Sequence, residues 1–278
     1  MIKRFHKGSS RADFPESERL RFDTTEIHKS WVDYNLPTHI LRYDFASKFV
    51  ESKKTLDVAC GNGYGSSYML RYKPKIVVGV DYSRIAINEG KALFRNELLT
   101  LLVGDATDMG FSDKAFDVVV SFETLEHIRN QEKFLNEILR ILRNDGVLII
   151  STPNKDAFSA YDKFYYNRYH VRELTLSEFY SMLRGYFRKV DLYGQIQVGT
   201  IYRILRDIRR ILAKKTGVDL LQLYRLVRLF PNLSDRSEQI YSLRTKRTAI
   251  PKFLIAVCRN NVSEGDLPVK SKKTNWLH

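Results

Sequence analysis

Short apolar segments alternate with helical patterns through the first half of the chain. The apolar runs lie at residues 55–59, 76–80, 99–103, 116–121 and 146–151, and helical periodicity separates them at 64–72, 83–94 and 131–142. Strands that are apolar throughout and alternate with helices are typical of a parallel sheet covered on both faces. The pattern therefore predicts a doubly wound α/β domain, with ligands bound outside the carboxyl ends of the strands.

Glycines at alternate positions follow the first of these strands. The segment 55–66 reads TLDVACGNGYGS, in which Gly61, Gly63 and Gly65 come after the apolar run. Glycine permits a tight turn and a close approach of the backbone to a ligand, and the helix expected next would direct N–H groups at that ligand. Taken alone, the spacing fits a nucleotide site and a merely tight strand-to-helix turn equally well.

Three aspartates lie at or just after the ends of the first three strands. Asp57 is in the end of the first strand, Asp81 directly follows the second, and Asp105 follows the third. A carboxylate after the second strand is placed to accept hydrogen bonds from a ribose diol. Any one of these aspartates could instead cap a helix or a turn. Three in register with the glycine turn favour a ligand that contains a nucleoside.

Five successive segments resemble the motifs of class I S-adenosylmethionine-dependent methyltransferases, in the family's order. They are Asp57–Gly65, Gly79–Ser83, Val103–Ala106, Phe116–Ile128 and Asn144–Asn154. The resemblance covers residues 31–193, with 252–258 as an expected final strand. Two further segments, 39–46 and 169–175, are similar to the branch related to ubiquinone-biosynthesis methyltransferases, and more closely to members associated with glycan synthesis.

The resemblance implies a cofactor, S-adenosylmethionine, and a set of residues that hold it. Gly61 and Gly63 would pack against its methionine portion, Asp57 would orient the amino group, Asp81 would bind the ribose, and Asp105 the adenine amino group. The full set implied is Asp57, Ala59, Gly61, Gly63, Asp81, Tyr82, Asp105, Ala106 and Phe122. A nicotinamide-dependent oxidoreductase could use the same turn and Asp81, but it explains Asp105 less well.

Candidate groups for the acceptor side follow the fourth and fifth strands. An aliphatic hydroxyl is a weak nucleophile, so methyl transfer to it needs a general base within hydrogen-bond reach. His127 is the first candidate and His170 the second, although each could instead anchor a loop. Glu123, Glu126 and Arg172 are expected to contact the acceptor. No metal site is predicted, because these residues show no ligand spacing.

The predicted function is O-methylation of a glycan or of a sugar-containing, lipid-linked acceptor. Methylation of a small lipid or quinone precursor, and a non-enzymatic role as a cofactor-binding partner module, are the alternatives. Nucleic acid is disfavoured as a partner, because the place where amine methyltransferases carry Asn or Asp, two prolines and an aromatic reads Ser121-Phe122-Glu123-Thr124. Neither Cys60 nor Cys258 is well placed to be the nucleophile that pyrimidine C5 methylation needs. Only the net positive charge therefore supports RNA as the methyl acceptor.

Much of the positive charge lies in one segment. The formal net charge is +14, and residues 195–250 hold twelve Lys and Arg against four Asp and Glu. Within it, 201–230 reads as two basic amphipathic helices. They are expected to form a lid over the acceptor, and the alternative is a basic surface that lies on an anionic membrane or grips a phosphate.

The expected organisation is an N-terminal arm at 1–30, a methyltransferase domain at 31–258 with the basic helical insertion at 195–250, and a flexible tail at 259–278. A helix over 38–50 is expected to pack on the sheet, or to cover the cofactor through Tyr34, Arg42 or Tyr43. Two cysteines and no apolar run of bilayer length predict a cytoplasmic protein, with any membrane contact peripheral and on the inner surface. No feature of the sequence indicates an oligomeric state.

Overall fold

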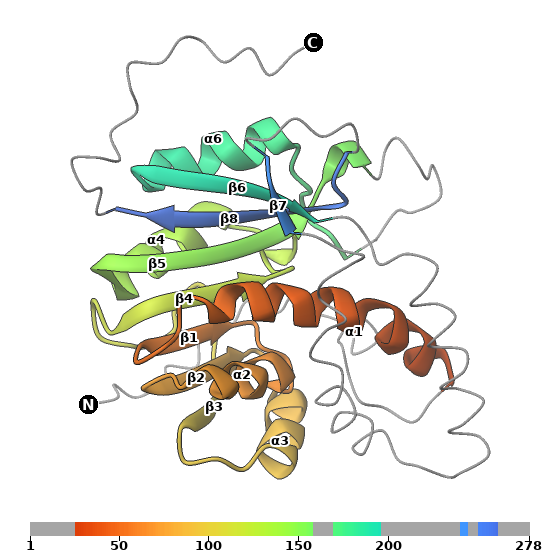
Figure 1. Cartoon of the computed structure of the whole chain (residues 1–278), viewed down its shortest axis with the longest axis vertical. Helices are drawn as coiled ribbons and strands as arrows, with labels where there is room; N and C mark the ends of the chain where they lie inside the picture. Colours follow the sequence, from red (N-terminus) through yellow and green to blue (C-terminus); the bar gives the residue numbers. More distant parts are fainter. Residues whose placement is uncertain (1–25, 158–168, 196–239, 244–249, 261–278) are drawn as a thin grey trace.

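A mixed sheet forms the centre of the computed structural model, which describes residues 26–157, 169–195, 240–243 and 250–260 (Figure 1). The order of its eight strands is β3-β2-β1-β4-β5-β8-β6-β7. The strands are β1 (Lys54–Val58), β2 (Ile76–Asp81), β3 (Leu99–Val103), β4 (Phe116–Phe122), β5 (Leu142–Pro153), β6 (Lys189–Gln195), β7 (Ile240–Ser242) and β8 (Phe253–Arg259). The helices are α1 (Glu26–Ser47), α2 (Tyr64–Met69), η2 (Leu70–Tyr72), α3 (Arg84–Leu93), η3 (Leu125–His127), α4 (Gln131–Ile141) and α6 (Leu176–Tyr186).

The sheet divides into a parallel half and an antiparallel half. Strands β1 to β5 pair in parallel, as the alternation of strands and helices predicts. Strand β8 runs antiparallel between β5 and β6, and β7 adds an antiparallel edge on β6. The order reverses between β1 and β4, so the carboxyl ends of these two strands flank the crevice where a ligand binds in such sheets.

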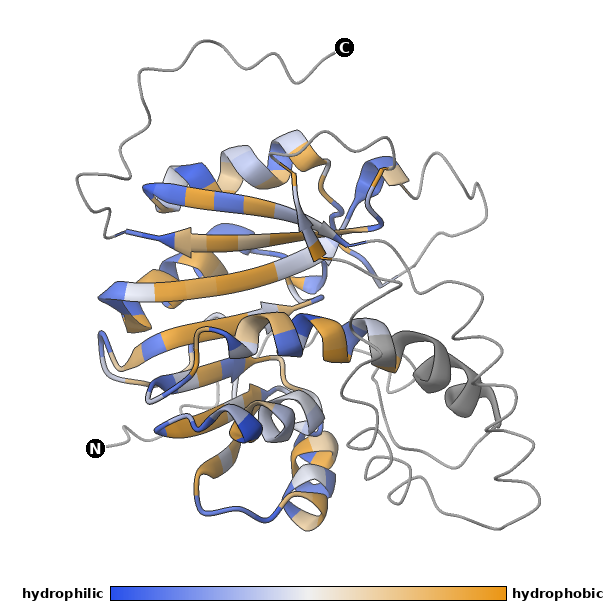
Figure 2. Cartoon of the chain, viewed as in Figure 1, coloured by the Kyte–Doolittle hydropathy of each residue, from blue (hydrophilic) through white to orange (hydrophobic). Residues whose placement is uncertain are grey.

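Two apolar layers cover the sheet, one on each face. Along β4, Val118 and Val120 face a cluster that includes Tyr43 of α1 and Tyr68 of α2. Between them, Val119 faces the opposite cluster, which takes in α4 and α6. Strand residues alternate in direction, so a strand buried on both faces must be apolar throughout. The middle strands are accordingly drawn mostly in orange in Figure 2.

Local signals set the beginnings of several helices. The Ser83 and Asn130 side chains accept hydrogen bonds from the third backbone N–H of α3 and α4. Thr175 and Glu178 form a reciprocal capping box at the start of α6. Such caps satisfy N–H groups that have no partner within the helix.

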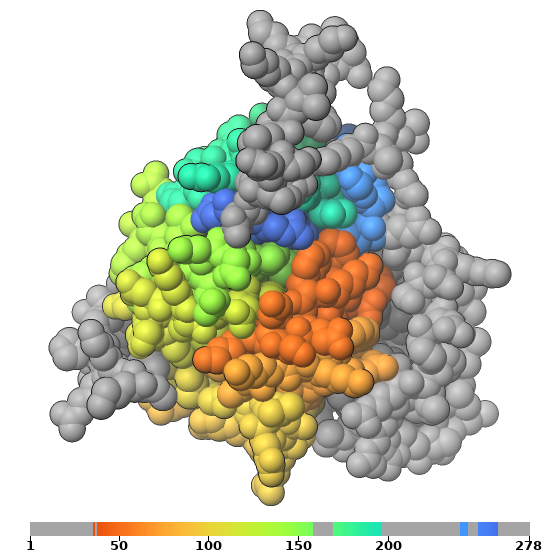
Figure 3. Space-filling view, turned by 60° about the vertical axis from the view of Figure 1, so that its left-hand side comes forward, coloured from red at the N-terminus to blue at the C-terminus, as the bar shows by residue number. Residues whose placement is uncertain are grey.

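The N-terminal helix differs from its predicted extent. It begins at Glu26 instead of near Thr38, so residues 26–30 belong to α1, and the rest of the expected arm lies outside the described residues. Its second half packs on the sheet. In Figure 3 the surface of α1 borders that of β7, and Gln195 Nε2 donates to Thr38 O over 3.0 Å. No helix among the described residues combines the length and apolar character needed to cross a bilayer.

The expected insertion is described only at its end. Residues 240–242 form strand β7, after the two helices that the sequence predicts at 201–230. Residues 201–230, on which the lid and membrane predictions rest, lie outside the described residues, as does the tail from 261.

Candidate active site

The glycine turn after β1 has the backbone that its sequence predicts. Ala59, Gly61 and Gly63 all have positive φ, at 59°, 60° and 81°. A Cβ on Gly63 would lie 2.7 Å from Leu101 Cδ2, whereas a Cβ on Gly61 would meet nothing within 4 Å. Gly63 therefore fits a close-packed position, and the open space beside Gly61 is a cradle that a ligand could enter.

Asp81 holds two backbone segments at this turn. Its Oδ2 accepts from Gly61 N over 2.9 Å and its Oδ1 from Ser83 N over 2.8 Å. The next residue, Tyr82, is 51% exposed. The carboxylate thus fixes the glycine turn and the start of α3 together, at the position where the sequence predicts a ribose ligand.

Asp57 is fully buried and bonded on both oxygens. Ser66 Oγ donates to Oδ2 over 2.6 Å, and Tyr43 OH donates to Oδ1 over 3.3 Å. Burial raises the pKa of Asp57 to about 7, against the opposing effect of these hydrogen bonds. The side chain thus ties β1 to both α2 and α1, and its role toward the cofactor amino group stays a prediction. We call Asp57, Gly61, Gly63 and Asp81 the cofactor edge.

The remaining cofactor predictions fall in two environments. Asp105 is exposed, and its Oδ1 accepts from the backbone and hydroxyl of Thr107, while Ala106 beside it is partly buried. Phe122 is buried instead, with its ring centroid 5.0 Å from that of Tyr43. Asp105 and Ala106 follow the end of β3, whereas Phe122 lies in the apolar core on the face of the sheet that α1 and α2 cover.

A buried ion pair follows β4. Arg42 Nη1 of α1 donates to Glu123 Oε1 over 2.5 Å and to Ser151 Oγ over 3.2 Å, and its guanidinium lies 4.6 Å from the Phe253 ring centroid. Glu123 has a positive φ of 51°. The Arg42 side chain is 0% exposed, and its Nε and Nη2 have no hydrogen-bond partner among the described residues. From the sequence, Arg42 is expected only to cover the cofactor, and this ion pair is not predicted.

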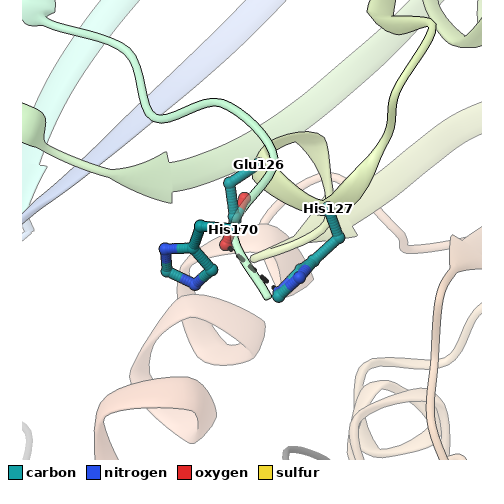
Figure 4. A group of neighbouring side chains, drawn as sticks. All are labelled: Glu126, His127 and His170. Carbon is teal, nitrogen blue, oxygen red and sulfur yellow. Dashed lines mark ion pairs between the residues drawn. The ribbon is translucent and has the colours of Figure 1, made fainter. Parts of the chain in front are cut away.

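A second polar group lies beside it on η3 and the loop that precedes α6 (Figure 4). The backbone N–H groups of Val171 and Arg172 both donate to the Glu126 carbonyl, over 2.8 Å and 3.2 Å. These bonds bring His170 against His127, with ring centroids 4.9 Å apart in an edge-to-face arrangement. We call Glu126, His127 and His170 the acceptor cluster.

Hydrogen bonds orient both imidazoles. His127 Nδ1 lies 3.2 Å from Tyr169 O, which can only accept, so Nδ1 carries the proton. His170 Nδ1 lies 2.5 Å from Glu173 Oε1. Burial, and to a lesser degree the neighbouring His170, lower the pKa of His127 to about 4, against the opposing effect of the bond to Tyr169. Nε2 of His127 is therefore unprotonated near pH 7.

Glu126 is the most deeply buried member of the cluster. Its side chain is 1% exposed, and its Oε2 accepts from Thr152 Oγ1 over 3.2 Å. Oε1 has no hydrogen-bond partner among the described residues and lies 3.9 Å from His127 Nε2. Burial raises the pKa of Glu126 well above its usual value, and the charge of Glu123 raises it further.

Arg172 does not join these residues. Its side chain is 55% exposed, and its closest recorded carboxylate is Glu178, at 4.0 Å. Two groups that the sequence reading omitted, Ser151 and Thr152, bond to Glu123 and Glu126. Both stand at the carboxyl end of β5, so the rule that located the aspartates also points to them.

The chain resembles known proteins over this region. Residues 56–150 match the family model of a methyltransferase domain. A probable S-adenosylmethionine-dependent methyltransferase of Mycobacterium tuberculosis is 30% identical over 151 residues, which are 54% of each chain. The fatty-acid O-methyltransferase of Mycolicibacterium smegmatis is 35% identical over 114 residues, 41% of this chain and 40% of that one. This chain thus spans about half the length of these relatives or less.

Solved structures agree on the fold. The crystal structure of an S-adenosylmethionine-dependent methyltransferase from Thermotoga maritima superimposes with a TM-score of 0.57 at 15% identity, covering 84% of this chain and 94% of that one. The open cradle at Gly61 and the two carboxylates beside it fit a cationic cofactor that has no phosphate. The chain is therefore similar to S-adenosylmethionine-dependent methyltransferases, with its match to a methyltransferase domain at residues 56–150.

Proposed function

We propose that the chain methylates a hydroxyl group of a sugar-containing, lipid-linked acceptor, at the acceptor cluster. The observation that carries the reaction type is the oriented pair of histidines after β4 and β5, beside the cofactor edge. When bound, S-adenosylmethionine supplies a methyl group activated on a sulfonium. The chain's own task is then to position the acceptor oxygen and to remove its proton.

His127 is the group that takes the proton when no ion occupies the cluster. Its Nδ1 proton faces the Tyr169 carbonyl, which leaves Nε2 as an acceptor. The bound cofactor would give its methyl group to the acceptor oxygen and keep the electron pair of the carbon–sulfur bond. The hydroxyl proton moves to His127 Nε2. His170 is the second candidate, with Glu173 fixing its ring.

Two observations support an amphiphilic acceptor. The M. smegmatis relative is a fatty-acid O-methyltransferase. The sequence of 195–250 predicts apolar helical faces and has an excess of Lys and Arg. A lipid-linked saccharide has both an apolar chain and a phosphate, so one ligand would satisfy both features. Peripheral attachment to the inner face of a membrane through 201–230 is part of this proposal.

The test is methyl transfer from radiolabelled cofactor into extracts of the source organism, with His127→Ala as the inactive control. We expect label in the lipid-linked saccharide fraction, and mild acid that splits sugar from lipid should move it into the aqueous phase. Label that stays with the lipid after acid would favour the small-lipid alternative, which the fatty-acid relative supports. Label in RNA would overturn the proposal, and cofactor binding without any transfer would favour the partner-module role.

A further inference from the structure

We propose that the acceptor cluster is a binding site for a divalent transition-metal ion, held by Glu126, His127 and His170. One ligand atom from each residue lies within 4.8 Å of the other two. Figure 4 shows the three side chains converging from η3 and from the loop before α6. Atoms that share one ion at about 2.0–2.2 Å lie roughly 3–4 Å apart. Side-chain rotation alone can therefore close the site, and the separation of 3.9 Å between His127 Nε2 and Glu126 Oε1 already falls in that range.

The bonds behind the imidazoles are those of metal-binding histidines. A ligating histidine almost always donates its other ring N–H to a carboxylate or a backbone carbonyl, which fixes the tautomer and the ring plane. His127 does so to the Tyr169 carbonyl, and His170 is bonded to Glu173 Oε1. In both rings the recorded bond is made by Nδ1, and in His127 it is Nε2 that lies 3.9 Å from Glu126 Oε1.

Glu126 supplies the independent observation that a ligand is required. A buried carboxylate oxygen with no hydrogen-bond partner is costly, because it loses its hydration without replacement. Within the part of the chain that the structure describes, Oε1 of Glu126 is such an atom, and it lies 3.9 Å from His127 Nε2. Thr152 holds the other oxygen, Oε2, over 3.2 Å, so the carboxylate is fixed with Oε1 toward the two rings. A cation between them would satisfy this oxygen and neutralise its charge.

The donor set indicates the class of ion. Two imidazole nitrogens and one carboxylate oxygen suit Zn²⁺ and neighbouring first-row ions, whereas Mg²⁺ and Ca²⁺ prefer oxygen ligands. Three protein ligands leave at least one position open, as in catalytic sites. The sequence alone predicts no metal site, because adjacent residues 126 and 127 become ligands only when the fold brings residue 170 to them.

The ion's role rests on the proposed function, but the site does not. An acceptor hydroxyl that coordinates the ion becomes more acidic, as metal-bound water does. With the ion present, the two histidines act as ligands, and the hydroxyl proton leaves to solvent. The ion thereby takes over the task that His127 performs in its absence.

Direct binding measurements test the site without reference to methyl transfer. The full chain, free of any affinity tag and stripped with a chelator, is titrated with Zn²⁺ by calorimetry. Co²⁺ is then added to the stripped chain, and the visible d–d bands of a low-symmetry, four-coordinate ion are recorded. We expect one Zn²⁺ per chain and the Co²⁺ bands, which excess Zn²⁺ abolishes.

Three variants assign the ion to the cluster. Glu126→Gln keeps the acceptor for Thr152 but removes the charge, and it should weaken Zn²⁺ binding at least about 100-fold. Glu173→Gln alters only the hydrogen-bond partner of His170 and should weaken Zn²⁺ binding about 10–100-fold. Glu132→Gln changes an exposed acid at the start of α4 and should bind Zn²⁺ as the unaltered chain does.

Unchanged Zn²⁺ affinity and Co²⁺ bands in Glu126→Gln would overturn the proposal. The proposal would also be overturned if the unaltered chain bound Zn²⁺ no more tightly than His127→Ala does. If Glu126→Gln fails to fold, as judged by circular dichroism, Glu173→Gln and the Co²⁺ spectrum of the unaltered chain still decide. Zn²⁺ binding without methyl transfer would support the metal site and refute the proposed function. Methyl transfer without Zn²⁺ binding would support the function and refute the metal site.

Discussion

The cofactor edge and the acceptor cluster lie at the same end of one sheet but are built differently. At the cofactor edge, both oxygens of Asp57 and of Asp81 already accept hydrogen bonds from the chain. On the acceptor side, Glu126 Oε1 and two nitrogens of Arg42 are buried without hydrogen-bond partners among the described residues. The carboxylates of the cofactor edge are therefore satisfied by the described chain, although Asn62 Nδ2 in the same turn is buried without a partner there. On the acceptor side a ligand would satisfy polar atoms that the described residues leave unbonded.

This difference separates two kinds of pre-organisation. The cofactor edge holds backbone in place with carboxylates, so its substitutions should act on folding and cofactor affinity together. The acceptor cluster holds side chains ready for a ligand, so its substitutions should act on turnover and leave cofactor affinity intact. Four predictions test this separation, from the largest expected effect to the smallest.

Replacement of His127 by alanine should lower turnover by about 10²–10⁴-fold, because the proton acceptor or metal ligand is lost. Cofactor affinity, measured by calorimetry, should stay within error of the unaltered chain. Arg172→Ala is the matched control, since that side chain lies at the surface away from the cluster. A His127→Ala chain that fails to fold would mean that the histidine serves the loop and not the reaction.

Gly90→Ala should disturb the cofactor edge through α3. A Cβ at Gly90 would lie 2.0 Å from the backbone oxygen of Asn62 in the glycine turn, and overpacking of this kind costs about 1–3 kcal/mol or more. We expect a loss at the upper end of this range in the free energy of unfolding, measured with urea, and weaker cofactor binding. Gly185→Ala in α6 meets nothing within 4 Å and should instead stabilise by about 0.5–1 kcal/mol. Equal effects of the two changes would contradict this packing.

Asp81→Ala should weaken cofactor binding by about 1–3 kcal/mol, because the N–H groups of Gly61 and Ser83 lose their acceptor and the predicted ribose contact is removed. Calorimetry measures the change. Asp113→Ala is the control, because Asp113 is 74% exposed and bonds to Arg140. Unchanged affinity in Asp81→Ala would refute the assignment of this residue to the cofactor edge.

Asp57 should give the ligand-free chain a pH-dependent stability. Its pKa is raised to about 7 by burial, above the value in an unfolded chain, so the folded state retains a proton that the unfolded state releases. Between about pH 4 and 7 this group should lower the free energy of unfolding as pH rises, by about 1.4 kcal/mol per unit. Urea unfolding across this range, with Asp57→Asn as the comparison, isolates the contribution. A slope that survives in Asp57→Asn belongs to other groups.

The sequence predicts the strands and the glycine turn that carry the cofactor edge, because these parts are local. Strand ends, a glycine turn and the residues that follow can be read from short segments, and β1 to β5 and their helices appear where the pattern indicates. The acceptor cluster depends on the bonds from 171 and 172 to the carbonyl of residue 126. No local pattern encodes such contacts, so the histidines were recognised singly while their association was not.

Other differences have similar causes. The capping box of Thr175 and Glu178 is a local sequence signal that predicts the beginning of helix α6. Strand β7 gains its conformation by pairing with β6, and a three-residue strand carries little periodicity of its own. Its placement inside a segment of helical character therefore could not be predicted.

The position of β8 has a consequence for how the protein is made on the ribosome. This strand is the last in sequence that the structure describes, yet it separates β5 from β6 and pairs with both. Earlier strands can associate as they emerge, but β6 must wait for residues 253–259 before it joins the sheet. Until then β5 exposes an apolar edge, so this nascent chain is most exposed to aggregation just before its synthesis reaches β8.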